Sequence, residues 1–83
     1  MKTEILKYTI VLTKNAGGYT VSVPALPGCI SQGITVEESM THVKEAIELY
    51  LEVLAEDGQK APADTDIISS VVEVTSARLP LYA

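Results

Sequence analysis

The residues best suited to nucleophilic chemistry in this chain are its single cysteine, Cys29, and its single histidine, His42. A catalytic pair would need the two side chains in contact and a third group that orients the imidazole. The apolar spacing around His42 places it away from the stripe that contains Val43 and Ile47, which predicts a solvent-facing side chain. No basic residue near Cys29 in sequence lowers the pKa of its thiol, so we interpret it as a small apolar residue beside a turn.

Carboxylates in strands could instead hold the metal ions of a nuclease. Only Glu4 and Glu73 lie in segments that we expect to be strands, whereas a two-metal site needs several converging carboxylates. The glycines match no phosphate-binding loop. The sequence therefore predicts no catalytic residue, no metal site and no cofactor, and we do not expect an enzyme.

One set of charged residues does form a pattern. Glutamates recur at helical spacing on the polar face of a predicted helix, at Glu45, Glu48, Glu52 and Glu56. Like charges four residues apart cost about a few tenths of a kcal/mol each in an isolated helix. Two interpretations stay open: a solvated face kept acidic for solubility, or a docking surface for a basic partner.

Composition limits the remaining classes. The 83 residues predict one domain, residues 1–83, and the absence of Phe and Trp predicts a thin core. The net charge of −5 argues against direct binding of nucleic acid, which needs clustered Lys and Arg. A single cysteine excludes an internal disulfide and fits a reducing cytoplasm. We see no signal peptide and no apolar run long enough to span a membrane.

The elements that must position these residues follow from hydrophobic periodicity. Alternation of apolar and polar residues predicts strands, and a change to a period of 3.6 predicts a helix. The predicted order is β-β-β-α-β, an α+β fold in which one long helix packs on one face of a mainly antiparallel sheet. The predicted elements are strands at 4–13, 19–24 and 29–32, a helix at 36–57 and a last strand at 67–76.

Turn and cap residues separate these elements. Pro27 and Gly28 fit the central positions of a type II turn. Thr35 fits a helix N-cap with Glu38 as its capping-box partner, and Gly58 fits the C-terminal cap.

The apolar residues of the predicted last strand fall on both of its faces, with Ile67 and Val71 opposite Ile68, Val72 and Val74. One helix can cover only one face of the sheet. The other face, which would also carry Ile5 and Val11, would remain exposed in a monomer. The sequence therefore predicts a homo-oligomer, at least a dimer.

Several motifs in a fixed order resemble the HicB-like antitoxin family of bacterial and archaeal type II toxin–antitoxin systems. The matching pieces are Tyr19-Thr-Val-Ser-Val-Pro24, Leu26-Pro27-Gly28-Cys29, Gly33-Ile-Thr35 with Glu37-Glu38, and Lys44-Glu45-Ala46-Ile47-Glu48-Leu49-Tyr50-Leu51. The resemblance implies a partly degraded RNase H-like fold that has lost nuclease activity. It also implies a partner, a small basic toxin of the HicA type, which is a ribonuclease that the antitoxin binds and shields.

Longer members of the family carry a C-terminal DNA-binding domain of ribbon-helix-helix or helix-turn-helix type. This sequence stops at Ala83, soon after its predicted last strand, so we expect no C-terminal DNA-binding domain. The alternative to a toxin-neutralising module is an orphan HicB-like domain that acts as a structural or regulatory oligomer without a toxin.

Overall fold

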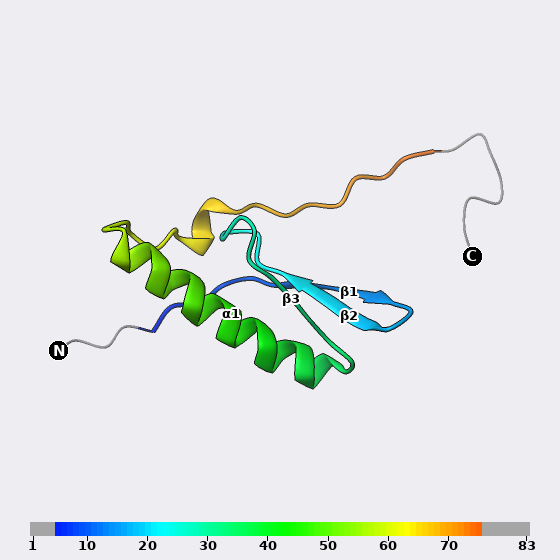
Figure 1. Ribbon diagram of the computed structural model, residues 1–83. Coiled ribbons are helices and arrows are strands. Elements are labelled where there is room, and N and C mark those ends of the chain that lie inside the picture. The colour runs from blue at the N-terminus through cyan, green and yellow to red at the C-terminus, as the bar shows by residue number, and fades with distance from the viewer. Residues whose placement is uncertain (1–4, 76–83) are drawn as a thin grey trace.

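The computed structural model describes residues 5–75 and shows three antiparallel strands followed by one long helix (Figure 1). The strands form one sheet in the order β1-β2-β3. The predicted α+β class, with its helix after the third strand, is confirmed. The elements are β1 (Val11–Asn15), β2 (Gly18–Ser22), β3 (Ile30–Gly33), α1 (Val36–Glu56) and the short 3-10 helix η1 (Asp64–Asp66).

The first hairpin is tighter than predicted. β1 continues to Asn15, which pairs with Gly18, so that only two residues remain for the turn in place of the predicted loop at 14–18. The Asn15 side chain accepts a hydrogen bond from the Gly17 N–H at 3.0 Å, which closes the turn. Gly18 has a φ of 140° and lies against the Gly33 carbonyl, where a side chain would clash.

The first strand also begins later than predicted. Residues 5–10 precede β1 without strand pairing, and Glu4 lies outside the described residues. The inward face is nevertheless the expected one, because Tyr8, Ile10 and Leu12 pack against the core. The alternating pattern thus predicted correctly which side chains turn inward, although the strand pairing covers only the last part of the segment.

The proline-rich connection between β2 and β3 has the predicted geometry. Gly28 has a φ of 83°, and the Cys29 N–H donates to the Leu26 carbonyl at 2.9 Å, as in a type II turn. A further bond from the Val23 N–H to the Cys29 carbonyl, at 3.1 Å, closes the base of the connection. Leu26 and Cys29 are thereby held in the core.

The bounds of α1 agree with the predicted helix to within one residue, because both ends are capped. The Thr35 hydroxyl accepts from the Glu38 N–H at 3.0 Å, and the Glu38 carboxylate accepts from the Ile34 N–H at 3.0 Å. At the other end Gly58 has a φ of 71° and donates to the Ala55 carbonyl at 3.0 Å, and the next N–H donates to the Leu54 carbonyl at 2.9 Å. These two bonds form a Schellman motif.

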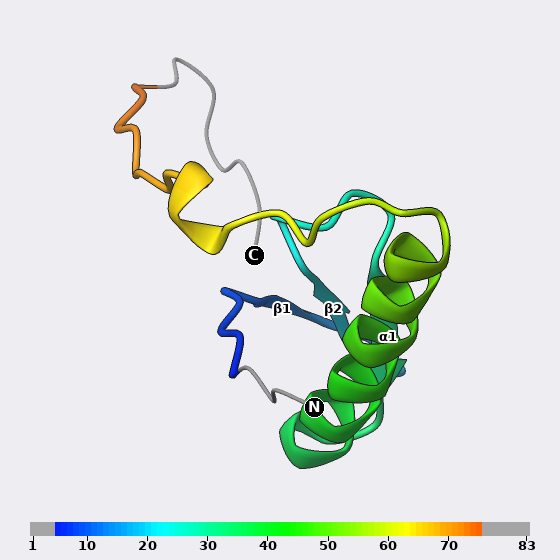
Figure 2. The same ribbon diagram turned by 90° about the vertical axis from the view of Figure 1, so that its left-hand side faces the viewer.

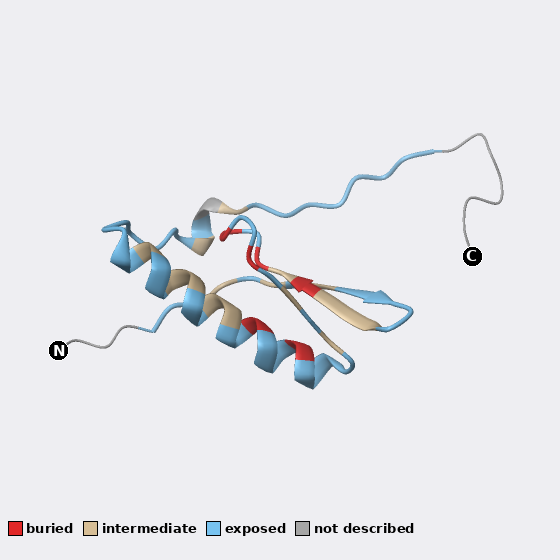
Figure 3. Cartoon of the chain, viewed as in Figure 1, coloured by how far each residue is buried: buried red, intermediate tan, exposed pale blue. Residues whose placement is uncertain are grey.

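The core lies where α1 crosses β2 and β3, which are the strands that the helix mainly contacts (Figure 2). The buried residues of the described chain are few, in agreement with the predicted thin core, and Tyr8 and Tyr50 are only partly buried against them. Figure 3 shows them at the crossing of helix and sheet and in the adjoining turn. The buried cluster consists of Val21, Val23, Leu26, Cys29 and Val43.

The predicted last strand is not formed. Residues 67–75 have no regular secondary structure and follow an extended path that leaves the helix and does not join the sheet (Figure 1), while residue 76 lies outside the described residues. High β propensity makes a segment suited to a strand but does not supply an edge with which to pair. The prediction that Ile67 and Val71 lie on an exposed sheet face is therefore wrong, because both residues belong to this separate segment.

Candidate functional site

The two candidate nucleophilic residues do not form a pair. Cys29 is only 4% exposed, and burial raises the pKa of its thiol, so the reactive thiolate is disfavoured. His42 lies on the exposed surface of α1, as predicted, and its Nδ1 atom donates to the Gln32 carbonyl at 2.6 Å, since a carbonyl can only accept. The two side chains line different grooves.

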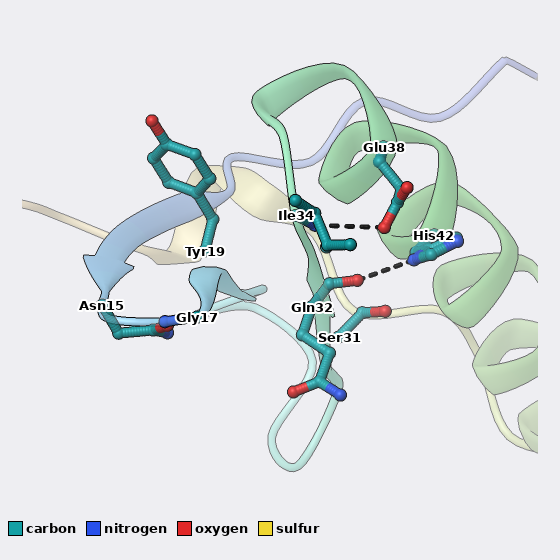
Figure 4. A pocket seen from close by; sticks show the side chains of 9 residues that line it. Asn15, Gly17, Tyr19, Ser31, Gln32, Ile34, Glu38 and His42 are labelled. Carbon is teal, nitrogen blue, oxygen red and sulfur yellow. Dashed lines mark hydrogen bonds between the residues drawn. The ribbon is translucent and has the colours of Figure 1, made fainter.

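The groove beside His42 lies between the β1–β2 hairpin, β3 and the start of α1 (Figure 4). Its imidazole and its carboxylate both form hydrogen bonds with the backbone: His42 donates to the Gln32 carbonyl, and Glu38 accepts from the Ile34 N–H. These bonds fix the connection between β3 and α1. Within residues 5–75, no three His, Cys, Asp or Glu side chains come together in a way that could hold a metal ion.

The predicted partner-binding glutamates all lie on the exposed surface of α1. We call these four residues the acidic ridge: Glu45, Glu48, Glu52 and Glu56. No basic residue occupies the last turn of α1, so the negative charge of the ridge adds to that of the helix C-terminus. The geometry places the ridge at the surface, where a basic partner could reach it.

An apolar groove that sequence reasoning missed borders the acidic ridge. It lies between the start of β3 and α1, and we call it the β3-side groove. Ile30 is 62% exposed, Leu49 61% and Val53 49%. Leu49 and Val53 fall outside the apolar stripe predicted for the helix, but their spacing of four residues beside the glutamates could have indicated a second apolar stripe. The groove is lined mainly by Ile30, Ala46, Leu49, Tyr50, Val53 and Leu54.

A second apolar groove lies between α1 and the segment that precedes β1. We call it the β1-side groove, and it has a volume of about 610 Å³. Met40 on α1 is 46% exposed and Leu6 on the preceding segment is 51% exposed, so the described chain leaves both walls of the groove partly uncovered. The groove is lined mainly by Leu6, Tyr8, Ile10, Met40, Ile47 and Leu51.

Hydrogen bonds at one end of this groove fix the chain beyond the helix. The Tyr8 hydroxyl donates to the Pro62 carbonyl at 2.7 Å. Asp64 accepts from both the N–H and the hydroxyl of Thr9, at 2.8 and 2.7 Å. Burial, and then the negative charge of Asp64, raise the pKa of Tyr8 above its ordinary value of 10.0, which favours the protonated hydroxyl that donates this bond.

Membrane insertion is not indicated by the helices of residues 5–75, since none of them combines the length and the apolar content that a span requires.

Several curated proteins are similar to this chain over most of their own length. A UPF0150 protein of Thermoplasma acidophilum is 48% identical over 60 residues, covering 71% of this chain and 87% of the relative. A UPF0150 protein of Archaeoglobus fulgidus is 53% identical over 57 residues, covering 65% and 83%. One from Synechocystis sp. is 44% identical over 66 residues, covering 78% and 84%.

A solved structure and a protein family also match this chain. A chain of the HicA3 and HicB3 toxin-antitoxin complex matches with a TM-score of 0.59 and 27% identity, over 66% of this chain and 64% of that chain. This chain therefore spans slightly less than two thirds of the solved one. Residues 8–77 match the family described as the HicB_like antitoxin of bacterial toxin-antitoxin systems. The chain belongs to this HicB-like antitoxin family.

Proposed function

We propose that this protein is an antitoxin module that binds and neutralises a small basic toxin of the HicA type. The observation that carries the proposal is the structural match to a chain of the HicA3 and HicB3 toxin-antitoxin complex, at 27% identity. The family match over residues 8–77 supports it independently. The module acts by binding and not by catalysis, which is consistent with the buried thiol of Cys29 and the backbone-bonded imidazole of His42.

The proposed docking surface combines the acidic ridge with the β3-side groove. Exposed charges steer a partner of opposite charge and raise the association rate, whereas apolar side chains that become fully desolvated hold the complex together. The ridge and the groove lie on adjoining sides of α1, so that one partner could cover both. The net charge of −5 adds a long-range attraction for a basic protein.

The experiment measures the association rate with a small basic toxin of the HicA type, by stopped flow at several salt concentrations. The triple variant Glu45→Gln, Glu48→Gln and Glu52→Gln should associate about tenfold more slowly at low salt. Its rate should also depend less on salt, because fewer charges remain to be screened.

A charge-matched control separates the ridge from net charge. The variant Thr13→Lys, Gln32→Lys and Gln59→Lys also makes the net charge more positive by three, at exposed positions outside α1. It should change the association rate less than the ridge variant does. Equal rates for the two variants would show that the ridge is only a solvated surface. Failure of the unaltered chain to bind the toxin or to inhibit its ribonuclease activity would reject the antitoxin role.

A further inference from the structure

Residues 67–75, which we call the extended segment, are the largest apolar feature that the fold does not use. Ile68 is 91% exposed, Val71 94%, and both Val72 and Val74 80%. An exposed run rich in β-branched residues has the composition of a strand that lacks its partner. The protein extends to 58 Å along its longest axis but only 28 and 20 Å along the others. Its radius of gyration is 16.3 Å, against about 12 Å for a compact chain of this length.

The same fold also leaves one edge of the sheet without a partner strand among the described residues. With the sheet order β1-β2-β3, the outer edge of β1 pairs with nothing in residues 5–75. The β1-side groove lies beside the residues that lead into this edge. Its walls are mainly apolar, with Leu6 and Ile10 on one and Met40 and Ile47 on the other, and Lys44 and Glu48 also line the helix wall. An added strand would satisfy the free backbone groups of the edge and could place alternate side chains in the groove.

We propose that the extended segment of one copy pairs beside β1 of a second copy, with Ile68, Val72 and Val74 covering the β1-side groove, and that the exchange is reciprocal. Each copy carries one donor segment and one acceptor edge, so a two-fold pair uses all of them and leaves none exposed. The origin of the segment is fixed on its own chain by the bonds of Asp64 to Thr9 and of Tyr8 to Pro62. From that origin the segment runs past its own sheet without joining it in Figure 1, and Figure 2 shows it extending away from the sheet.

A nine-residue strand spans about 30 Å at about 3.3 Å per residue, which is long enough to cross to the sheet of a neighbouring copy. The exchange differs from the face-to-face dimer that the sequence suggested, because the contact is a sheet edge and a groove. It does not depend on the toxin, so the test below uses the chain alone and its outcome leaves the proposed antitoxin role untouched.

The first measurement is sedimentation equilibrium of the full chain at micromolar concentration. We expect twice the monomer mass of 8.9 kDa. The double variant Val72→Asp and Val74→Asp should sediment as a monomer. Its helical circular dichroism should be unchanged, since both residues lie outside the core. The dissociation constant of its dimer should rise at least about 100-fold, because the added charges would be buried in the apolar groove. The control Gln59→Asp with Ala61→Asp adds the same charge in the exposed loop before η1 and should remain dimeric.

The second measurement establishes which chain the segment covers. In a Cys29→Ala background, copies with Ile10→Cys are mixed with copies with Val72→Cys and treated with a short bismaleimide. A covalent dimer joining the two kinds of copy is expected. Crosslinking within single chains of a double Ile10→Cys and Val72→Cys variant would overturn the proposal, since the segment would then cover its own groove. A mass of 8.9 kDa at all concentrations, or a dimer that survives both aspartates, would overturn it as well.

Discussion

The carboxylate of Asp64 accepts two hydrogen bonds from Thr9, one from its backbone N–H at 2.8 Å and one from its hydroxyl at 2.7 Å, although 55 positions separate the two residues. The contact joins the chain that follows α1 to the segment that precedes β1. It therefore fixes the point from which residues 67–75 depart, and it holds one end of the β1-side groove in place.

Removal of this contact should lower stability modestly. We expect Asp64→Ala to reduce the free energy of unfolding by about 1 kcal/mol, because two hydrogen bonds are lost at an exposed site. Asp64→Asn, which keeps one acceptor oxygen, should lose less. Denaturant unfolding measures both, with Glu45→Gln as a control that removes one exposed carboxylate from the ridge. A midpoint for Asp64→Ala equal to that of the control would mean that the contact contributes nothing to the fold.

Gly33 permits the close approach of β3 to α1. A Cβ atom at this position would lie 2.6 Å from both the backbone nitrogen and the hydroxyl of Ser39, which is completely buried. We expect Gly33→Ala to destabilise the protein by about 1–3 kcal/mol, because the start of α1 must shift away from the sheet.

Gly17→Ala is the matched control for this change. Its added Cβ would meet only the Asn15 side chain, at 3.8 Å, which is ordinary contact. Thermal unfolding should therefore show a clear fall in Tm for Gly33→Ala and little change for Gly17→Ala. Equal Tm values would show that the β3–α1 contact relaxes without cost.

Local features of the fold were predictable because local residues determine them. The turn at Pro27-Gly28 and the cap at Thr35 depend on backbone preferences and on partners within a few residues, and both were predicted correctly. The last strand was not, since Val71 and its neighbours carry a strand composition whose partner edge the sequence does not reveal. For the site, helical spacing predicted the exposed glutamates, but Leu49 was missed because one apolar stripe already accounted for the core.

Cys29 gives the protein a pH dependence whose direction follows from its burial. Burial raises the pKa of the folded thiol above its ordinary value of 9.0. The thiol is neutral in both states below that value, so its contribution to stability is complete there and is lost as the pH rises through the folded pKa. We expect Tm to fall more steeply above pH 9 for the unaltered chain than for Cys29→Ala.

Two controls isolate the thiol. Tyr8, whose pKa is also raised, from 10.0, is a second group that ionises in alkaline solution, so the comparison is repeated in a Tyr8→Phe background. Alkylation by iodoacetamide at pH 8 should be slow in native protein and fast in denaturant, because the thiol is 4% exposed. Rapid alkylation of the native protein would show that Cys29 is accessible and that burial does not govern its titration.

Substitutions in the two apolar grooves should affect different processes: those in the β3-side groove should affect toxin binding, and those in the β1-side groove should affect self-association. Leu49→Ser with Val53→Ser truncates the β3-side groove at positions that are 61% and 49% exposed, so folding should be little affected. If the toxin docks there, the variant should dissociate from it about tenfold faster or more with little change in association rate, since desolvated apolar contacts act mainly on the dissociation rate. The acidic ridge variant should show the opposite effect on the two rates: its association rate should fall, and its dissociation rate should change less.

The matched control truncates the other groove. Leu6→Ser with Met40→Ser changes side chains of similar exposure, 51% and 46%, that line the β1-side groove. This variant should leave toxin binding unchanged while weakening self-association, because the proposed occupant of that groove is the extended segment of a second copy. Surface plasmon resonance with the toxin immobilised gives both rates, and sedimentation gives the mass. Faster toxin dissociation from the Leu6 and Met40 variant alone would assign the toxin to the β1-side groove, so that toxin and second copy would compete for one surface.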